Sequence, residues 1–144
     1  MLCLILFRIG VSNFKYMPCC WHCNPERIKE MRIGIPKESL PGETRVAATP
    51  RTVVQLLKLG HEVVVESGAG KAASLEDSAY TAAGATVADA AAVWACEAVY
   101  KVNAPTEAEI DAIAAGTVLI SFVWPAQNPD LVEKLRERQI TVLA

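Results

Sequence analysis

The feature that most constrains the fold is a regular alternation of short apolar runs with helical segments through residues 31–144. Runs rich in β-branched residues predict six strands, at residues 32–35, 61–66, 85–88, 98–102, 117–123 and 140–143. Strands that alternate with single helices need crossover connections, which are right-handed, so the strands run parallel and helices cover both faces. The sequence therefore predicts an α/β fold with a flavodoxin-like parallel sheet.

Capping residues mark where the helices between these strands begin. Side chains that can accept hydrogen bonds from free backbone amides stand at Thr49, Ser74, Asp89, Thr106 and Asn128. Pro50 and Pro129 follow two of them, at the first helical position, where proline is favoured. Asp77 and Glu109 stand three residues after two others, which is capping-box spacing. These signals predict five helices, one in each gap between strands.

Residues 1–30 differ from the rest of the sequence and form a doubtful leader. Their apolar start is interrupted at Arg8, well short of the roughly 20 residues that a membrane-spanning helix needs. The charge follows the apolar run instead of preceding it, which is unlike a signal peptide. Because a clean strand pattern opens at Met31, we interpret residues 1–30 as disordered or as a mis-assigned start, and residues 31–144 as the domain.

Four of the five cysteines fall in this leader. Three cysteines and His22 stand together in residues 19–23 and offer zinc ligands. So tight a cluster is unlike structural zinc sites, which bring paired ligands from two separated places, and we expect no metal. The domain holds only Cys96, so it has no internal disulfide and suits a reducing compartment.

The charge balance restricts the partners of the chain. The formal net charge is −2, and neither sign forms a long run. Such a chain has no strong attraction for phosphate backbones or anionic membranes. We therefore expect a soluble domain without a transmembrane helix and without a nucleic-acid partner.

No group of side chains in the domain has the pattern of a catalytic site. His61 opens a predicted strand without an evident partner, and Cys96 lies in an alanine-rich segment typical of a buried, inert thiol. Residues 68–73 fit the G-x-G-x-x-A form of a phosphate loop, but the next helix signal, at Ser74, comes too late for helix amides to meet a phosphate. We favour a plain turn there and predict no catalytic residue.

Four side chains follow the predicted strands at their carboxyl ends, the edge where parallel α/β sheets bind ligands: Arg45, Lys101, Trp124 and Gln127. Arg45 and Lys101 suit a small carboxylate, with an ordinary surface cation as the alternative. Trp124 and Gln127 suit a crevice or a domain interface, with simple packing as the alternative for Trp124. We name these four as possible remnants of a crevice or substrate pocket.

Five segments of the domain, in order, resemble the alanine dehydrogenase/transhydrogenase N-terminal domain family: residues 31–38, 43–50, 65–70, 101–105 and 121–129. By this resemblance, alanine dehydrogenases use the residues corresponding to Arg45 and Lys101 to hold pyruvate. They also place a catalytic histidine after the phenylalanine of the central strand. This chain has Phe122-Val-Trp-Pro125 there, without a histidine. The segment through Pro129 is more similar to transhydrogenase alpha subunits.

The resemblance to alpha subunits implies a function for a larger parent enzyme. Such an enzyme transfers hydride from NADH to NADP, coupled to proton translocation at the cytoplasmic face of the inner membrane. The alpha subunit, a dimer when complete, holds NAD, and the beta subunit holds NADP. The family's nucleotide-contact residues are expected after Ala144, so no cofactor-binding residue is assigned here. Alternatives are an alanine dehydrogenase fragment or a stand-alone module that binds small carboxylates.

The same resemblance implies that the domain is one incomplete lobe of a two-lobed NAD-binding unit. In the family, the chain returns to this lobe after the nucleotide-binding domain. Residues 31–144 are therefore expected to lack a closing helix or strand, to be inactive alone and to expose apolar surface.

Overall fold

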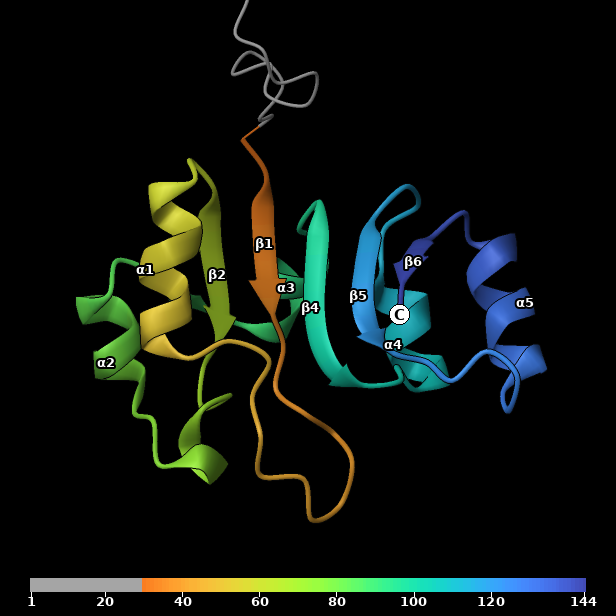
Figure 1. Cartoon of the computed structure of the whole chain (residues 1–144), viewed down its shortest axis with the longest axis horizontal. Helices are drawn as coiled ribbons and strands as arrows, with labels where there is room; N and C mark the ends of the chain where they lie inside the picture. The colour runs from red at the N-terminus through yellow and green to blue at the C-terminus, as the bar shows by residue number, and fades with distance from the viewer. Residues whose placement is uncertain (1–29) are drawn as a thin grey trace, which may run out of the picture.

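Six strands form one parallel sheet in the order β3-β2-β1-β4-β5-β6 (Figure 1). The computed structural model describes residues 30–144, and the predictions for residues 1–29, including the cluster at 19–23, lie outside them. The strands are β1 (Arg32–Ile35), β2 (Glu62–Glu66), β3 (Thr86–Ala88), β4 (Ala98–Asn103), β5 (Val118–Phe122) and β6 (Thr141–Leu143). The helices are α1 (Pro50–Lys58), η3 (Lys71–Ala73, a 3₁₀ turn), α2 (Asp77–Ala82), α3 (Ala90–Trp94), α4 (Glu107–Ala112) and α5 (Pro129–Glu137).

The sheet is doubly wound, which confirms the predicted α/β class with helices on both faces. From β1 the chain first builds outward through β2 to β3, then crosses back to pair β4 with β1 and builds outward in the other direction. This strand order is the one found in Rossmann dinucleotide-binding folds and differs from the flavodoxin order 2-1-3-4-5. The reversal of direction places a topological switch point between β1 and β4.

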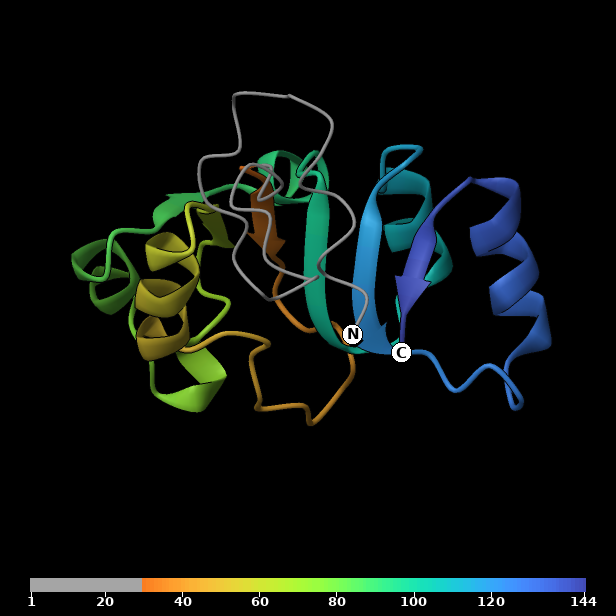
Figure 2. The same ribbon diagram turned by 45° about the horizontal axis from the view of Figure 1, so that its top comes forward.

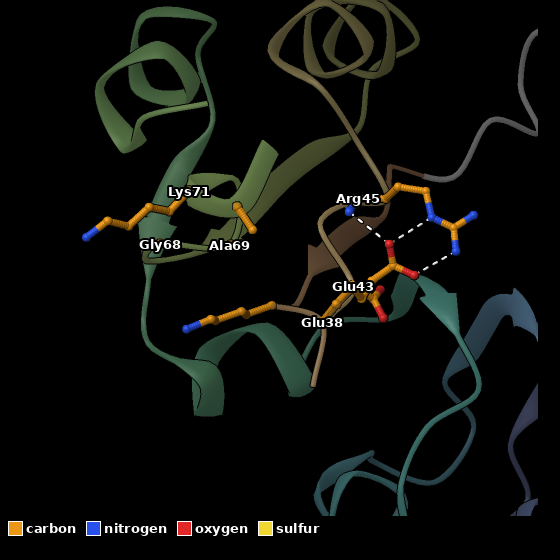
Figure 3. A pocket seen from close by; sticks show the side chains of 8 residues that line it. Glu38, Glu43, Arg45, Gly68, Ala69 and Lys71 are labelled. Atoms are coloured by element: carbon orange, nitrogen blue, oxygen red, sulfur yellow. Dashed lines mark hydrogen bonds and ion pairs between the residues drawn. The ribbon is translucent and has the colours of Figure 1, made fainter. Parts of the chain in front are cut away.

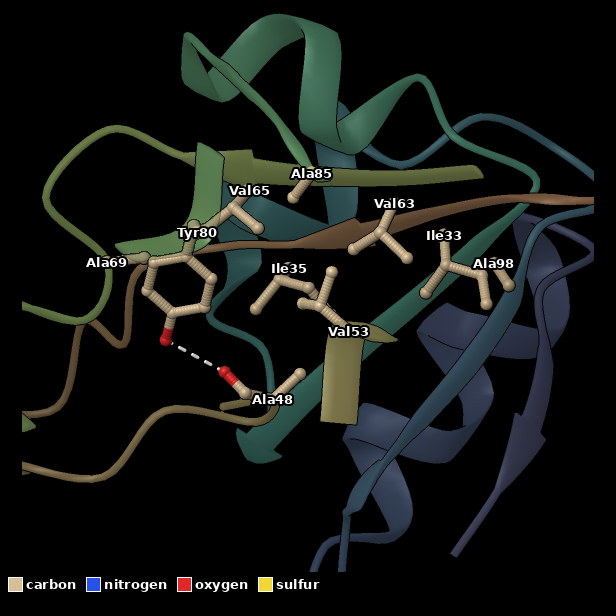
Figure 4. Close-up of a cluster of buried hydrophobic side chains, with 10 residues drawn as sticks. All are labelled: Ile33, Ile35, Ala48, Val53, Val63, Val65, Ala69, Tyr80, Ala85 and Ala98. Carbon is tan, nitrogen blue, oxygen red and sulfur yellow. Dashed lines mark hydrogen bonds between the residues drawn. The ribbon is translucent and has the colours of Figure 1, made fainter. Parts of the chain in front are cut away.

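One face of the sheet packs against α1 and α2 (Figure 4). The side chains buried there are Ile33, Ile35, Ala48, Val53, Val63, Val65, Ala69, Tyr80, Ala85 and Ala98. Tyr80 is fully buried, and its hydroxyl donates a 2.8 Å hydrogen bond to the carbonyl of Ala48. This bond satisfies the only polar group of a large core side chain and fixes the end of the long loop that leaves β1.

The opposite face packs against α3, α4 and α5. Its buried side chains are Val64, Val93, Trp94, Cys96, Val99, Ile110, Ile113, Leu119, Val123, Leu135 and Ile140. Gly34 lies on this face, and a Cβ atom there would stand 2.3 Å from the Val93 carbonyl oxygen. Glycine is therefore required in β1 because the backbone of α3 approaches the strand too closely for any side chain.

Three of the predicted helix caps are confirmed. The Thr49 and Asp89 side chains accept hydrogen bonds from the backbone amides of Thr52 and Ala92. Thr106 forms the predicted capping box, in which its hydroxyl accepts from the Glu109 amide and the Glu109 carboxylate accepts from the Thr106 amide. These contacts fix the first turns of α1, α3 and α4.

Two predicted side-chain caps do not form. Ser74 lies in the left-handed region at the end of η3, and α2 begins at Asp77. The Asp77 carboxylate accepts instead from the Gly68 amide and the Ser67 hydroxyl, so it holds the turn that leaves β2. Asn128 occupies the predicted N-cap position of α5, but its side chain makes no cap hydrogen bond, because its amide donates back to the carbonyls of Val123 and Trp124.

Half of the face that carries α1 and α2 has no helix over it among residues 30–144 (Figures 1 and 2). The strand register places five apolar side chains on this half: Tyr100, Val118, Ile120, Phe122 and Leu143. Each is exposed or only partly buried, and we call this surface the open face. It agrees with the expected incomplete lobe, because parallel sheets are normally covered on both faces.

Candidate functional site

The loop from β1 to α1 crosses the carboxyl edge of the sheet and meets the end of β4, at the switch point (Figure 1). Glu38 makes the junction. Its carboxylate accepts from the backbone amides of Val102 and Asn103 and from the Lys101 ammonium, whose Nζ lies 3.0 Å away. Loops that diverge at such a point form the usual ligand crevice of doubly wound sheets.

Lys101 lies inside this junction instead of on the surface. Its side chain is fully buried, and the ammonium pairs with Glu38 and, at 3.4 Å, with Glu109 of α4. Two carboxylates around one buried ammonium neutralise the cost of removing it from water. The surface-cation alternative is therefore wrong for Lys101. Because the ammonium is already paired with two glutamates, it is not free to bind the carboxylate of a ligand.

Arg45 and Glu43 form a second ion pair at the same edge (Figure 3). The Arg45 guanidinium donates two hydrogen bonds to the Glu43 carboxylate, of 2.8 and 2.6 Å, and the Arg45 amide donates a third. The Asn103 side-chain amide donates to Glu43 and also to Glu38. Asn103 thus links the exposed Arg45 pair to the buried Lys101 pair.

Electrostatics follow this geometry. The bonds from Arg45, and then that from Asn103, hold the pKa of Glu43 far below its ordinary value of 4.5. The same pair raises the pKa of Arg45. Both groups therefore stay charged at every physiological pH, and neither can serve as an acid or a base in catalysis.

A cavity of about 290 Å³ opens beside this pair (Figure 3). Its lining consists of Lys37, Glu38, Glu43, Arg45, Gly68, Ala69, Lys71 and Ala72. Arg45 and Lys71 lie on opposite sides of the cavity, and both are exposed. The charges suit a small anion, but the guanidinium face of Arg45 is already taken up by Glu43.

The loop after β2 is a turn, and three of its backbone amides are engaged within it. The amide of Gly68 donates to Asp77, and those of Ala69 and Lys71 donate to carbonyls within the turn. Its single-turn helix, η3, ends at a left-handed Ser74. Residues 68–73 therefore have the form of a strand-exit turn that Asp77 holds.

The loop after β5 presents aromatic side chains at the same edge. Trp124 and Phe122 are exposed over 61% and 60% of their surfaces, and their ring centroids are 6.3 Å apart. Gln127 is also exposed. Packing is therefore the wrong alternative for Trp124, which faces solvent. Trp124 and Gln127 lie on a loop separate from the Arg45 and Lys101 pairs.

The two remaining titratable candidates have no reactive environment. Burial raises the pKa of the Cys96 thiol, which donates weakly to the Ala92 carbonyl. His61 stands before β2 and its Nδ1 is buried without a hydrogen-bond partner in the described part of the chain. Among residues 30–144, no three His, Cys, Asp or Glu side chains gather as metal ligands, and no helix has the length and apolarity to cross a bilayer.

Comparison with known proteins agrees with this architecture. Residues 34–144 match the family described as "Alanine dehydrogenase/PNT, N-terminal domain". The chain belongs to this family. The alpha subunit of NAD(P) transhydrogenase from Haemophilus influenzae is 51% identical over 114 residues, which are 79% of this chain and 22% of that subunit. The chain thus spans about a fifth of the length of this relative.

Solved structures give the same relationship. The structure of an L-alanine dehydrogenase superposes with a TM-score of 0.77 at 36% identity, covering 79% of this chain and 32% of the other. The transhydrogenase from Sinorhizobium meliloti gives 0.76 at 35% identity, covering 78% and 34%. The relatives of this alanine dehydrogenase/PNT N-terminal domain are oxidoreductases.

Sequence reasoning missed three polar residues of this domain's switch-point network: Glu38, Glu43 and Asn103. Arg45 was placed correctly at the carboxyl edge, but its partner two residues earlier was not recognised. The available signal was the spacing of Glu38 after β1 and of Asn103 at the end of β4. Side chains at those two positions meet only if β1 pairs with β4. The sequence did not predict this strand order.

Proposed function

We propose that the chain is the N-terminal lobe of the alpha subunit of a proton-translocating NAD(P) transhydrogenase, the subunit that holds NAD(H). The observation that carries this proposal is the carboxyl end of β5. There an exposed tryptophan, Trp124, stands where alanine dehydrogenases are expected to carry their catalytic histidine. The sequence identity of 51% to a transhydrogenase alpha subunit, against 42% to an alanine dehydrogenase from Bacillus subtilis, supports the same choice.

The ion pairs at the switch point also favour this function over amino-acid oxidation. A dehydrogenase of a small amino acid needs a free cation for the substrate carboxylate and a titrating group for the proton. Here Lys101 is buried between two glutamates, and Arg45 is bound by Glu43. These residues are well suited to fix the shape of the loop after β1. Direct hydride transfer between two nicotinamide rings requires positioning and no protein acid or base.

The open face supports assignment as one lobe of a larger unit. Its five apolar side chains need a cover, and the relatives are three to five times longer than the matched segment. We infer that the remainder of the alpha subunit supplies a helix over β4 and β5. It also supplies the NAD-binding fingerprint, while the beta subunit supplies NADP and the membrane domain. In this assembly the lobe lies at the cytoplasmic face of the inner membrane, within an alpha-subunit dimer.

A domain replacement tests the proposal. Residues 31–144 would replace the matching segment of the Haemophilus influenzae alpha subunit, and the chimera would be assembled with its beta subunit in membranes. We expect NADPH-dependent reduction of an NAD analogue at a rate near that of the unmodified enzyme. We expect no reduction of NAD in the presence of L-alanine.

One control variant and two contrary outcomes make this result decisive. Trp124→His in the chimera introduces the missing histidine and should not create L-alanine oxidation, because Lys101 and Arg45 remain paired. A folded chimera that assembles with the beta subunit but transfers no hydride would contradict the proposal. Oxidation of L-alanine by the unmutated chimera would instead indicate the alanine dehydrogenase function.

A stand-alone carboxylate-binding module is the second candidate, favoured only by the 290 Å³ cavity beside Arg45. Under this alternative, pyruvate would raise the melting temperature of the isolated chain, and Arg45→Ala would remove the effect. Arg51→Ala, on the exposed first turn of α1, is the matched control. Because Glu43 occupies the guanidinium, we expect no stabilisation by pyruvate in any of the three proteins.

A further inference from the structure

Trp124 has a backbone conformation that its sequence disfavours twice. Its φ is +49°, in the left-handed region that side chains other than glycine, asparagine and aspartate rarely adopt. It also precedes Pro125, and a residue before proline is normally held in extended conformations. Such strain persists only where surrounding contacts impose it, and it concentrates at functional sites.

The contacts that impose this conformation converge on one atom. The Trp124 carbonyl oxygen accepts from the amides of Gln127 and Asn128, at 2.9 and 3.1 Å, and from the Asn128 side chain at 3.3 Å. The Asn128 side chain also donates to the Val123 carbonyl at 2.9 Å. Asn128 therefore fixes the loop instead of capping α5, and the position of the indole is set by the backbone and not by burial.

The strained tryptophan is exposed next to a second aromatic ring. Phe122 and Trp124 are tilted by 30°, and both project from the end of β5. Phe122 belongs to the open face and ends β5, and Trp124 lies two residues further, at the carboxyl edge. A large ring held out to solvent by backbone strain has no role in the packing of residues 30–144.

The chemistry around Trp124 favours a planar ring over an anionic group. Residues 122–129 carry no charged side chain, so the loop offers no cation to a phosphate or a carboxylate. The Gln127 side chain makes no hydrogen bond with the described residues and can both donate to and accept from a carboxamide. Aromatic rings stack on such a surface, and the carboxyl edge is where doubly wound sheets receive ligands.

We propose that Trp124, supported by Phe122, is a stacking surface for the nicotinamide ring of NAD(H), with Gln127 beside the ring's carboxamide. This inference rests on the proposed function and adds a positioning residue to it. The dinucleotide phosphates are bound elsewhere in the parent subunit. Trp124 contacts the ring and excludes water from one side of it, so the ring is positioned for hydride transfer.

Calorimetry with two ligands tests this role in the chimeric alpha subunit described above. NADH carries the nicotinamide ring, whereas ADP-ribose has the same remaining parts without it. We expect Trp124→Ala to raise the Kd for NADH about tenfold, the lower part of the range for loss of one stacking contact. The Kd for ADP-ribose should stay unchanged, and Trp124→Phe should restore most of the NADH affinity.

The remaining outcomes are separated by controls. Leu40→Ala removes another exposed apolar side chain of the carboxyl edge and should change neither Kd. Equal weakening of both ligands by Trp124→Ala would mean a structural role, and no change in either would place the ring elsewhere, with the indole covered by protein. Both results overturn the inference and leave the proposed function standing. A failure of the unmutated chimera to bind either ligand would overturn both.

Discussion

Lys101 shows how one buried charge can organise a loop. Its ammonium is fully buried between Glu38 and Glu109, and Glu38 also accepts two backbone amides of β4. The pair therefore ties the loop after β1 to the neighbouring strand. Such a pair adds little net stability over apolar residues, but removal of one partner leaves the other charge buried and uncompensated.

Lys101→Met should therefore lower the free energy of unfolding by about 3 kcal/mol. The reason is the Glu38 carboxylate, which would remain buried with hydrogen bonds but no cation. The double variant Lys101→Met/Glu38→Gln should lose less than the single variant, because it removes the more deeply buried of the two carboxylates that lose their cation. Urea denaturation of the isolated chain at pH 7 measures both values. A double variant less stable than Lys101→Met would show that the ion pair itself is strongly stabilising.

Glu43 makes the stability of the folded chain depend on pH. Its pKa in the folded chain lies far below 4.5, because Arg45 and Asn103 bind the ionised form. A carboxyl with a depressed pKa contributes stability that is complete above its unfolded pKa and is lost as pH falls toward its folded pKa. The unmutated chain should therefore have a larger free energy of unfolding than Glu43→Gln at pH 7. This difference should shrink steadily below about pH 4.5.

Urea denaturation at pH 7 and at pH 3 measures this change. Glu76→Gln is the control, because Glu76 is exposed and forms no ion pair among residues 30–144. The difference in free energy of unfolding between Glu76→Gln and the unmutated chain should be nearly the same at both pH values. A Glu43→Gln difference that does not shrink at pH 3 would show that the Arg45 pair does not form in solution.

At the scale of elements, the sequence predicted well what depends on neighbouring residues. All six strands appear where β-branched runs stand, and Thr49, Asp89 and Thr106 cap helices as their positions indicate. The failures at Ser74 and Asn128 have one cause. The side chains of Asp77 and Asn128 form hydrogen bonds with residues outside their own helices, and the local sequence pattern does not indicate these partners.

The candidate site was less predictable for the same reason. The carboxyl-edge position of Arg45 and Trp124 followed from strand boundaries. Burial of Lys101 and the roles of Glu38 and Asn103 depend on β4 pairing with β1, a contact between distant segments. The left-handed conformation of Trp124 opposes the local preference of a residue before proline. The resemblance of sequence segments identified the family, but the contacts of Lys101, Glu38 and Asn103 became known only from the structure.

For the whole molecule, the open face determines how the isolated chain behaves. Tyr100, Val118, Ile120, Phe122 and Leu143 form an apolar surface over which no helix of residues 30–144 packs. Surfaces of this kind bind apolar dyes and drive self-association. The isolated chain should therefore bind an anilinonaphthalene dye and sediment in part as oligomers.

Leu143→Lys should reduce both dye fluorescence and self-association, because it places a charge within the open face. Leu59→Lys is the matched control, since Leu59 and Leu143 are exposed over 56% and 55% of their surfaces but Leu59 follows α1, away from the open face. Fluorescence titration and sedimentation velocity compare the two variants. Equal effects would show that exposed leucine in general is responsible, and not this surface.

The pairing of β1 with β4 also sets an order of events during synthesis. Lys101 and Glu38, which join the two strands, are 63 residues apart. A ribosome that adds 5–20 residues per second needs about 3 to 13 seconds to make that interval. Throughout it, β1, β2 and β3 can pair while the inner edge of β1 has no neighbour. The centre of the finished sheet is therefore the edge of the nascent one, and during this interval it is open to pairing with strands of other chains.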